Sequence, residues 1–141
     1  MAHFGEHVTY DGYGADPGIL DCRAAVHGVL ADLAAKLGMT VLAGPVVYLA
    51  EATNAKDPGG WTGMVVLQES HISVHTFPAR GFVSADVYTC QNGLDTEAVR
   101  QFLRKRFAAS DDEVHHLKRG TRYPTLDLHP ERVRHAGRDR G

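Results

Sequence analysis

Cysteine and long apolar runs are scarce in this sequence. Its 141 residues include only two cysteines, Cys22 and Cys90, which are too few for a disulfide-stabilised scaffold. No apolar stretch approaches the ~20 residues that span a bilayer, and residues 1–14 lack the basic and then apolar segments of a signal peptide. We therefore expect a reduced, cytoplasmic protein with no membrane partner.

An excess of charge of either sign is also lacking. The formal net charge is −2, so there is no electrostatic case for nucleic acid or an anionic membrane as a partner. A hydrophobic content of 43% and a charged content of 23% still allow a packed core in a chain of one-domain length. We expect one domain over residues 1–120 and a mobile tail over 121–141, where Pro124, Pro130 and several arginines interrupt any apolar periodicity.

Hydrophobic spacing predicts two helices. The first begins after the capping pair Asp16-Pro17 and ends at Gly38, because apolar residues recur between them at intervals of three and four. The second begins near Asp95 and carries an apolar face that includes Val99 and Leu103. Each helix therefore has one face to lay on a sheet.

Alternating and β-branched segments predict six strands. They are expected at residues 7–13, 40–49, 62–68, 71–77, 82–89 and 113–117. Gly44-Pro45 lies inside the second segment and marks it as a bulged strand or an edge strand. These elements predict an α+β fold, a two-layer sandwich in which two helices pack on one face of a mostly antiparallel β-sheet.

Reactive side chains are concentrated between residues 69 and 90. Ser70 follows the acidic Glu69, His75 comes five residues later, and Cys90 ends the next apolar run. Taken alone, a serine and a histidine at this spacing are usually strand surface, and the cysteine is usually a small buried hydrophobe. His71 and His75 are four residues apart, but the Ile-Ser-Val between them is typical of a strand, so we assign no metal ligands here.

The whole window resembles a known family. Residues 69–90 read ESHISVHTFPARGFVSADVYTC. The small prokaryotic form of the S-adenosylmethionine decarboxylase family has the pattern E-S-H-[IL]-[ST]-[IV]-H-T-W-P-E-x-G-Y-x-x-x-D-[VL]-F-T-C. The resemblance implies a decarboxylase proenzyme of polyamine biosynthesis that cuts itself into chains 1–69 and 70–141. It also implies that the two chains stay associated, and that cleaved pairs form a homodimer acting on a small substrate of the amino acid type.

The resemblance also implies a role for each reactive residue. The Ser70 hydroxyl attacks the carbonyl of Glu69, and the cut leaves a pyruvoyl group at position 70. This cofactor forms a Schiff base with the substrate amine and takes up electrons when carbon dioxide leaves. His75 matches the base that processing requires, Thr62 stands where the family usually has the serine that stabilises the oxyanion, and Cys90 matches the proton donor.

Strand geometry sets a condition on this scheme. Ser70 and His75 are an odd number of residues apart, so an unbroken strand would turn them to opposite faces of the sheet. For His75 to act on Ser70, the chain has to turn at Glu69-Ser70. We therefore predict a local break there, with backbone strain as part of the cleavage mechanism.

The resemblance weakens at the residues that recognise adenosine. Family members place a ribose-binding glutamate directly after His-Thr-Trp-Pro, and here that residue is Ala79, which cannot accept hydrogen bonds. The family's adenine-stacking aromatic residue aligns with Lys56, in a loop longer than usual, and Tyr48 or Trp61 are the substitutes nearby.

Some family members are pyruvoyl-dependent L-arginine or L-ornithine decarboxylases. Such a substrate needs a carboxylate for its distal cation, and Glu51, Asp57 and Asp11 are the candidates. Ala79 narrowly favours arginine or ornithine as the substrate, with S-adenosylmethionine as the alternative. Two readings from other classes are an uncleaved homologue that acts as a regulatory subunit, and a metal-binding module that uses some of the nine histidines.

Overall fold

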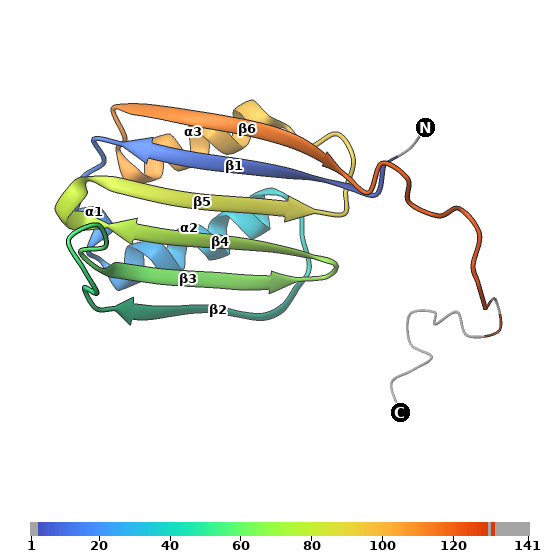
Figure 1. Ribbon diagram of the computed structural model, residues 1–141, viewed down its shortest axis with the longest axis horizontal. Coiled ribbons are helices and arrows are strands. Elements are labelled where there is room, and N and C mark those ends of the chain that lie inside the picture. Colours follow the sequence, from blue (N-terminus) through green and yellow to red (C-terminus); the bar gives the residue numbers. More distant parts are fainter. Residues whose placement is uncertain (1–2, 130, 132–141) are drawn as a thin grey trace.

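Six antiparallel strands form one sheet in the computed structural model of the protein, which describes residues 3–129 and 131 (Figure 1). The strand order is β2-β3-β4-β5-β1-β6. The strands are β1 (Gly5–Tyr13), β2 (Val41–Ala50), β3 (Gly60–Leu67), β4 (Ser70–Phe77), β5 (Phe82–Thr89) and β6 (Asp111–Arg119). All neighbouring strands pair antiparallel, as the predicted α+β class requires.

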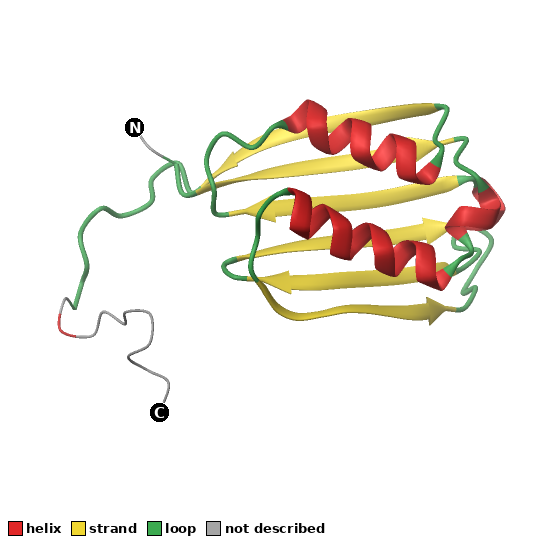
Figure 2. Cartoon of the chain, turned by 180° about the vertical axis from the view of Figure 1, so that it is seen from behind, coloured by secondary structure: helices red, strands yellow, loops and turns green. Residues whose placement is uncertain are grey.

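The helices lie on one side of this sheet, as Figure 2 shows. They are α1 (Pro17–Leu20), α2 (Arg23–Lys36) and α3 (Thr96–Phe107), and a short 3-10 turn, η1 (Pro78–Arg80), joins β4 to β5. The predicted two-layer sandwich is therefore confirmed, with the two longer helices packed on one face.

The first predicted helix is interrupted, so a single helix from Pro17 onward is wrong. Asp16 caps α1 by accepting hydrogen bonds from the amides of the next turn, and the helix ends after Leu20. Leu20 is fully buried, and its carbonyl accepts a hydrogen bond from Thr76 Oγ1 at 2.8 Å. This contact with β4 holds the chain so that it turns before α2 begins, with Cys22 as the N-cap of α2.

The second predicted helix, α3, is confirmed. Asp95 accepts a hydrogen bond from the Ala98 amide at 3.0 Å, and Val99, Leu103 and Phe107 are fully buried. These three residues recur at intervals of four, so they form one stripe that packs on the core.

The core lies between the helices and the facing side of the sheet. Alternation along β4 turns Ile72 and Val74 to this side, where both are fully buried. Leu30 and Leu33 of α2 are equally buried and belong to the same apolar cluster. Burial of these side chains is the main force that holds the helices on the sheet.

The opposite side of the sheet, which we call the open face, is covered by none of the described helices (Figures 1 and 2). The intervening residues of β4, namely His71, Ser73, His75 and Phe77, lie on this face because strand side chains alternate. The strand register places residues of the two neighbouring strands beside each of them. His75, for example, lies between Thr62 of β3 and Ser84 of β5.

The edge strand β2 and the segment after β6 correspond to two further predictions. β2 is an edge strand and its register shifts on both sides of Ala43, as the Gly44-Pro45 pair predicts. Beyond β6, the ring of Tyr123 packs against Phe4 with centroids 4.9 Å apart. Position 130 and positions 132–141 of the predicted tail lie outside the described residues. In the described part, no helix combines the length and apolarity needed to cross a membrane.

We expect Thr76→Val to destabilise the fold. Thr76 Oγ1 accepts a hydrogen bond from the Trp61 amide at 3.0 Å and donates to the buried Leu20 carbonyl, so valine removes both hydrogen bonds. The free energy of unfolding, measured in urea, should fall by about 1–3 kcal/mol. Thr9→Val on the open face is the matched control and should change it by less than about 0.5 kcal/mol. Equal effects of the two substitutions would contradict this account.

Candidate active site

A tight turn precedes Ser70. Gln68 and Glu69 connect β3 to β4, and Leu67 pairs with Ser70 across the turn. Glu69 has a φ of 59°, in the left-handed region, which costs a non-glycine residue roughly 1–2 kcal/mol. The break predicted directly before Ser70 is therefore present, and the Glu69-Ser70 bond lies at the exit of a strained turn.

Ser70 is in contact with Cys90, the residue that matches the proton donor of the family. The backbone N–H of Cys90 donates a hydrogen bond to Ser70 Oγ at 3.1 Å. Both residues line a cavity of about 230 Å³, together with Glu69, Gln91 and residues 38–40 of the loop between α2 and β2. The structure thus brings Cys90 and the Glu69-Ser70 bond, which the resemblance implies is cut, into one small cavity at the end of the sheet.

Thr62 and His75 form a second pair, away from this cavity. Thr62 Oγ1 and His75 Nδ1 are within hydrogen-bonding distance, at 3.1 Å, and the two residues are register partners on β3 and β4. β4 runs without interruption from Ser70, so His75 lies on the opposite face and about 17 Å along the strand from Ser70. The expectation that the break would bring His75 to Ser70 within one chain is therefore wrong.

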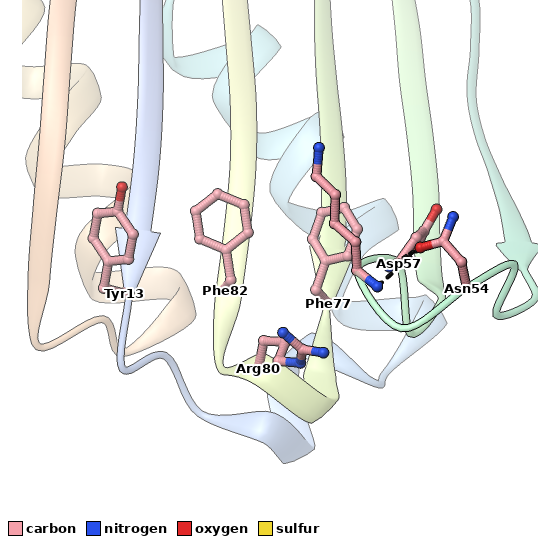
Figure 3. Close-up of a pocket in the computed structure, with 7 residues that line it drawn as sticks. Tyr13, Asn54, Asp57, Phe77, Arg80 and Phe82 are labelled. Carbon is pink, nitrogen blue, oxygen red and sulfur yellow. Dashed lines mark hydrogen bonds between the residues drawn. The ribbon is translucent and has the colours of Figure 1, made fainter.

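Three aromatic side chains lie beside the Thr62–His75 pair. Tyr13, Phe82 and Phe77 end three neighbouring strands on the open face, with ring centroids 5.4 Å and 5.6 Å apart (Figure 3). We call them the aromatic row. They line a pocket of about 620 Å³ that is closed by Asn54, Lys56, Asp57 and Arg80. The aromatic row was not predicted from the sequence, although Tyr13 and Phe77 are the last residues of β1 and β4, Phe82 is the first residue of β5, and their parity turns all three to the open face.

The pocket carries charges of both signs. Tyr13 donates a hydrogen bond to Glu113; this contact, partial desolvation and the nearby Asp11 raise the pKa of Tyr13 to about 12. Asp57 accepts a hydrogen bond from the Gly59 amide at 3.1 Å, which orients its carboxylate at the pocket wall. Acidic groups of the loop and of β1 therefore face the same region as Lys56 and Arg80.

The remaining substrate candidates are dispersed. Ala79 and Glu51 line a neighbouring hollow of about 450 Å³. Tyr48 pairs with Thr62 across the edge of the open face, whereas Trp61 lies on the helix side of β3 and packs against the core. Of the two aromatic substitutes, only Tyr48 thus lies on the same face as Thr62.

A buried carboxylate lies next to the cysteine cavity. Glu6 of β1 accepts hydrogen bonds from His3 (3.0 Å) and His116 (2.7 Å), and from the amides of Gly93 (2.6 Å) and Leu94 (3.2 Å). Burial alone would raise the pKa of Glu6, but these hydrogen bonds outweigh burial and lower the pKa to about 2. Sequence reasoning missed Glu6 because nothing in a short strand segment indicates four converging donors.

Histidines are plentiful, yet they do not converge as metal ligands would. Among residues 3–129 and 131, no group of three or more His, Cys, Asp or Glu side chains is arranged to hold a metal ion. Several histidines instead form hydrogen bonds with other polar side chains, as His7 does with Asp86 at 3.0 Å and with Arg119 at 3.3 Å.

The fold defines the class of protein. The crystal structure of an adenosylmethionine decarboxylase from Aquifex aeolicus superimposes on this chain with a TM-score of 0.72 and 25% sequence identity. The match covers 85% of this chain and 93% of the other. The protein therefore has the fold of a decarboxylase, built from the antiparallel sheet and helices described above.

Sequence comparison narrows the class to a family. The family model for S-adenosylmethionine decarboxylase matches residues 6–120. S-adenosylmethionine decarboxylase proenzymes from Pyrococcus horikoshii and Halalkalibacterium halodurans are each 32% identical to this chain over 120 residues. These matches cover 85% of this chain and 81% and 89% of the two relatives. The chain belongs to the S-adenosylmethionine decarboxylase family.

We expect the stability of the fold to depend on Glu6 at low pH. The pKa of Glu6 is lowered on folding, so its stabilising contribution is fully present above about pH 4.5 and is lost as the pH falls toward about 2. The free energy of unfolding, measured by urea denaturation, should therefore fall less steeply over this range for Glu6→Gln than for the unsubstituted protein. Glu51→Gln, in an exposed loop, is the control. Identical pH profiles for Glu6→Gln and the unsubstituted protein would contradict the assignment.

Proposed function

We propose that the protein is a self-processing, pyruvoyl-dependent decarboxylase whose substrate is an α-amino acid with a cationic side chain. The observation that carries the proposal is the contact between Ser70 and Cys90 at the exit of a strained turn. Support comes from the relatives, whose names call them decarboxylase proenzymes.

Processing starts at the turn. Attack of Ser70 Oγ on the Glu69 carbonyl carbon forms an ester and breaks the Glu69-Ser70 amide bond. Elimination then leaves Oγ on the new carboxylate of Glu69, and water replaces the nitrogen of residue 70, which departs as ammonia. The left-handed Glu69 favours this step, because cleavage releases the strain of the turn.

The pyruvoyl ketone would condense with the substrate amine and accept the electrons that carbon dioxide leaves behind. Cys90 lines the same cavity as residue 70, so its thiol would deliver the proton that completes turnover. The residues present therefore fit the group, since one of them generates it and another lies beside it.

Thr62 and His75 would act from a second copy of the chain. Within one chain they are too far from Ser70 to stabilise the oxyanion or to remove a proton. In a two-fold dimer, one surface meets the same surface of the partner, so one end of a sheet can face the other end of the partner's sheet. Each site of such a dimer combines Ser70 and Cys90 of one chain with Thr62 and His75 of the other.

The open face supplies a surface for this pairing. Its apolar side chains are exposed near both edges of the sheet: Val46 44%, Tyr48 66%, Met64 40%, Val66 41% and Leu117 50%. Exposed apolar side chains gathered on one face are typical of an interaction surface. We therefore propose a homodimer in which two open faces meet, so that the Thr62–His75 pair of one chain lies at the contact and approaches the end of the partner's sheet, where the partner's Ser70–Cys90 cavity lies.

Mixed dimers test the composite site. Ser70→Ala and His75→Ala chains should each stay uncut alone. When the two are co-expressed, the His75→Ala chain should be cut, because the Ser70→Ala partner supplies an intact His75. Intact-mass spectra of the mixture measure the cut. Ser70→Ala/His75→Ala is the matched control partner and should give no rescue. An uncut mixture of folded, associated chains would show that the site is not shared.

The substrate proposal rests on the residues near the aromatic row. Ala79 offers no acceptor for ribose hydroxyl groups, whereas Asp57 lines the pocket and Asp11 lies nearby on the open face. A carboxylate that faces aromatic rings suits the distal cation of arginine or ornithine. We therefore favour a basic amino acid as the substrate, which would place the enzyme in polyamine biosynthesis.

S-adenosylmethionine is the second candidate. The three rings of the aromatic row offer a stacking surface for adenine, and the sulfonium is also a cation. The relatives are named for this substrate. Glu51 shares a hollow with Ala79 and supplies the carboxylate that Ala79 lacks for binding a ribose.

Carbon dioxide release from the three substrates separates these candidates. If arginine or ornithine is the substrate, Asp57→Asn should lower kcat/KM for it at least about tenfold, because an ionic hydrogen bond is lost. Glu51→Gln is the matched control and should leave that value unchanged. Turnover of S-adenosylmethionine alone, with loss of activity in Glu51→Gln, would refute the basic amino acid and support the second candidate.

A further inference from the structure

The turn that carries Cys90 is held in place by hydrogen bonds to Glu6 of β1. Glu6, which is 3% exposed, accepts hydrogen bonds from the amides of Gly93 and Leu94 in the segment between Cys90 and α3. Both carboxylate oxygens are used, one for each amide, so the contact defines the position of the turn and not only its distance from β1.

A second observation places β1 directly against Cys90. Gly5 lies so close to the end of β5 that a Cβ atom built on it would lie 2.1 Å from the Thr89 carbonyl oxygen and 3.0 Å from Cys90 Cα. Only glycine permits this approach without displacing backbone. The start of β1 therefore holds the Cys90 turn by close packing and by the carboxylate of the next residue.

Self-cleavage would remove a different hydrogen bond of the same turn. In the uncut chain the Cys90 N–H is bonded to Ser70 Oγ. The chemistry proposed above transfers this oxygen to the carboxylate of Glu69, so the side chain of residue 70 no longer supplies an acceptor for the Cys90 amide once the cofactor forms. The contact from Glu6 remains, although Glu6 then belongs to fragment 1–69 and Cys90 to fragment 70–141.

We propose that Glu6 is a positioning residue that holds the Cys90 turn in the cleaved protein and so determines where the thiol delivers its proton. The proposal rests on the proposed function, since it concerns the decarboxylation that Cys90 would complete. Glu6 itself touches neither residue 70 nor a substrate; it acts through the Gly93 and Leu94 amides.

Misplacement of the thiol has a chemical signature. A proton delivered to the substrate carbon that lost carbon dioxide gives an amine product and, after hydrolysis, the unchanged cofactor. A proton delivered to the cofactor carbon gives, after addition of water, an aldehyde from the substrate and an alanine residue at position 70. The alanine keeps the nitrogen that the substrate brought, so atoms and electrons balance and no oxidant is needed. Each such event ends the activity of that site.

The test compares Glu6→Gln with His116→Gln. Both changes remove a hydrogen bond of the same carboxylate network, but the His116 hydrogen bond joins Glu6 to β6 and not to the Cys90 turn. The measured quantity is the number of 70–141 fragments that begin with alanine for each molecule of carbon dioxide released. Mass spectrometry and labelling of the new N-terminal amine count these fragments. We expect a rise of about tenfold in Glu6→Gln, the effect of a misplacement worth one charged hydrogen bond, and no change in His116→Gln.

Hydrogen exchange gives a readout that does not depend on turnover. The amides of Gly93 and Leu94 should be protected in the unsubstituted protein before and after the cut. They should exchange faster in Glu6→Gln, with the larger increase after the cut. If Glu6→Gln does not fold, Glu6→Asp replaces it, because the shorter side chain withdraws the carboxylate from the amides and keeps the charge.

Two results would overturn the proposal. One is an unchanged proportion of alanine ends in a folded Glu6 variant; the other is free exchange of the Gly93 and Leu94 amides in the cleaved, unsubstituted protein. An unsubstituted protein that is never cut, or is cut without releasing carbon dioxide, would instead refute the proposed function. In that case, exchange that is equal in the unsubstituted protein and in Glu6→Gln would still refute the role of Glu6, because it needs only the uncut fold.

Discussion

The two-residue alternation of β4 is the constraint on which the site depends. It sends Ile72 and Val74 into the core beneath the helices and turns His75 and Phe77 to the open face. A shift of one residue would turn three polar side chains, His71, Ser73 and His75, toward the core and expose Ile72 and Val74, so burial specifies the register strongly. Because Ser70 and His75 are five residues apart on this unbroken strand, they lie on opposite faces and at different ends of it, and the fixed register determines which face each one occupies.

This separation is the reason to propose that the open face is a contact between two copies of the chain. Each chain carries the Ser70–Cys90 contact at one end of the sheet and the Thr62–His75 pair at the other end, and in the proposed function each is one half of a catalytic site. Two copies related by a two-fold axis can complete both halves at once. The same face carries the exposed apolar side chains of β2 and β3, so the contact that assembles the site would also bury them.

The end of the sheet near Cys90 illustrates how a buried charge becomes tolerable. An isolated carboxylate is costly to bury, but four donors from three parts of the chain compensate Glu6. The energy that holds the charge also ties the start of β1, the end of β6 and the turn after β5 to one another. Strand pairing alone would leave that turn attached only through its own ends.

The α+β class, most strand positions, α3 and the break before Ser70 could be predicted from the sequence, because these features depend on local periodicity and capping. The sequence also identified Ser70 and Cys90, whose contact the structure shows. Only the tertiary structure decided that α1 ends at Leu20, that the aromatic row forms a pocket, that Glu6 collects four donors, and that His75 lies far from Ser70. Those features arise from register between strands distant in sequence and from the competition of separate segments for the same buried groups, which no local pattern records.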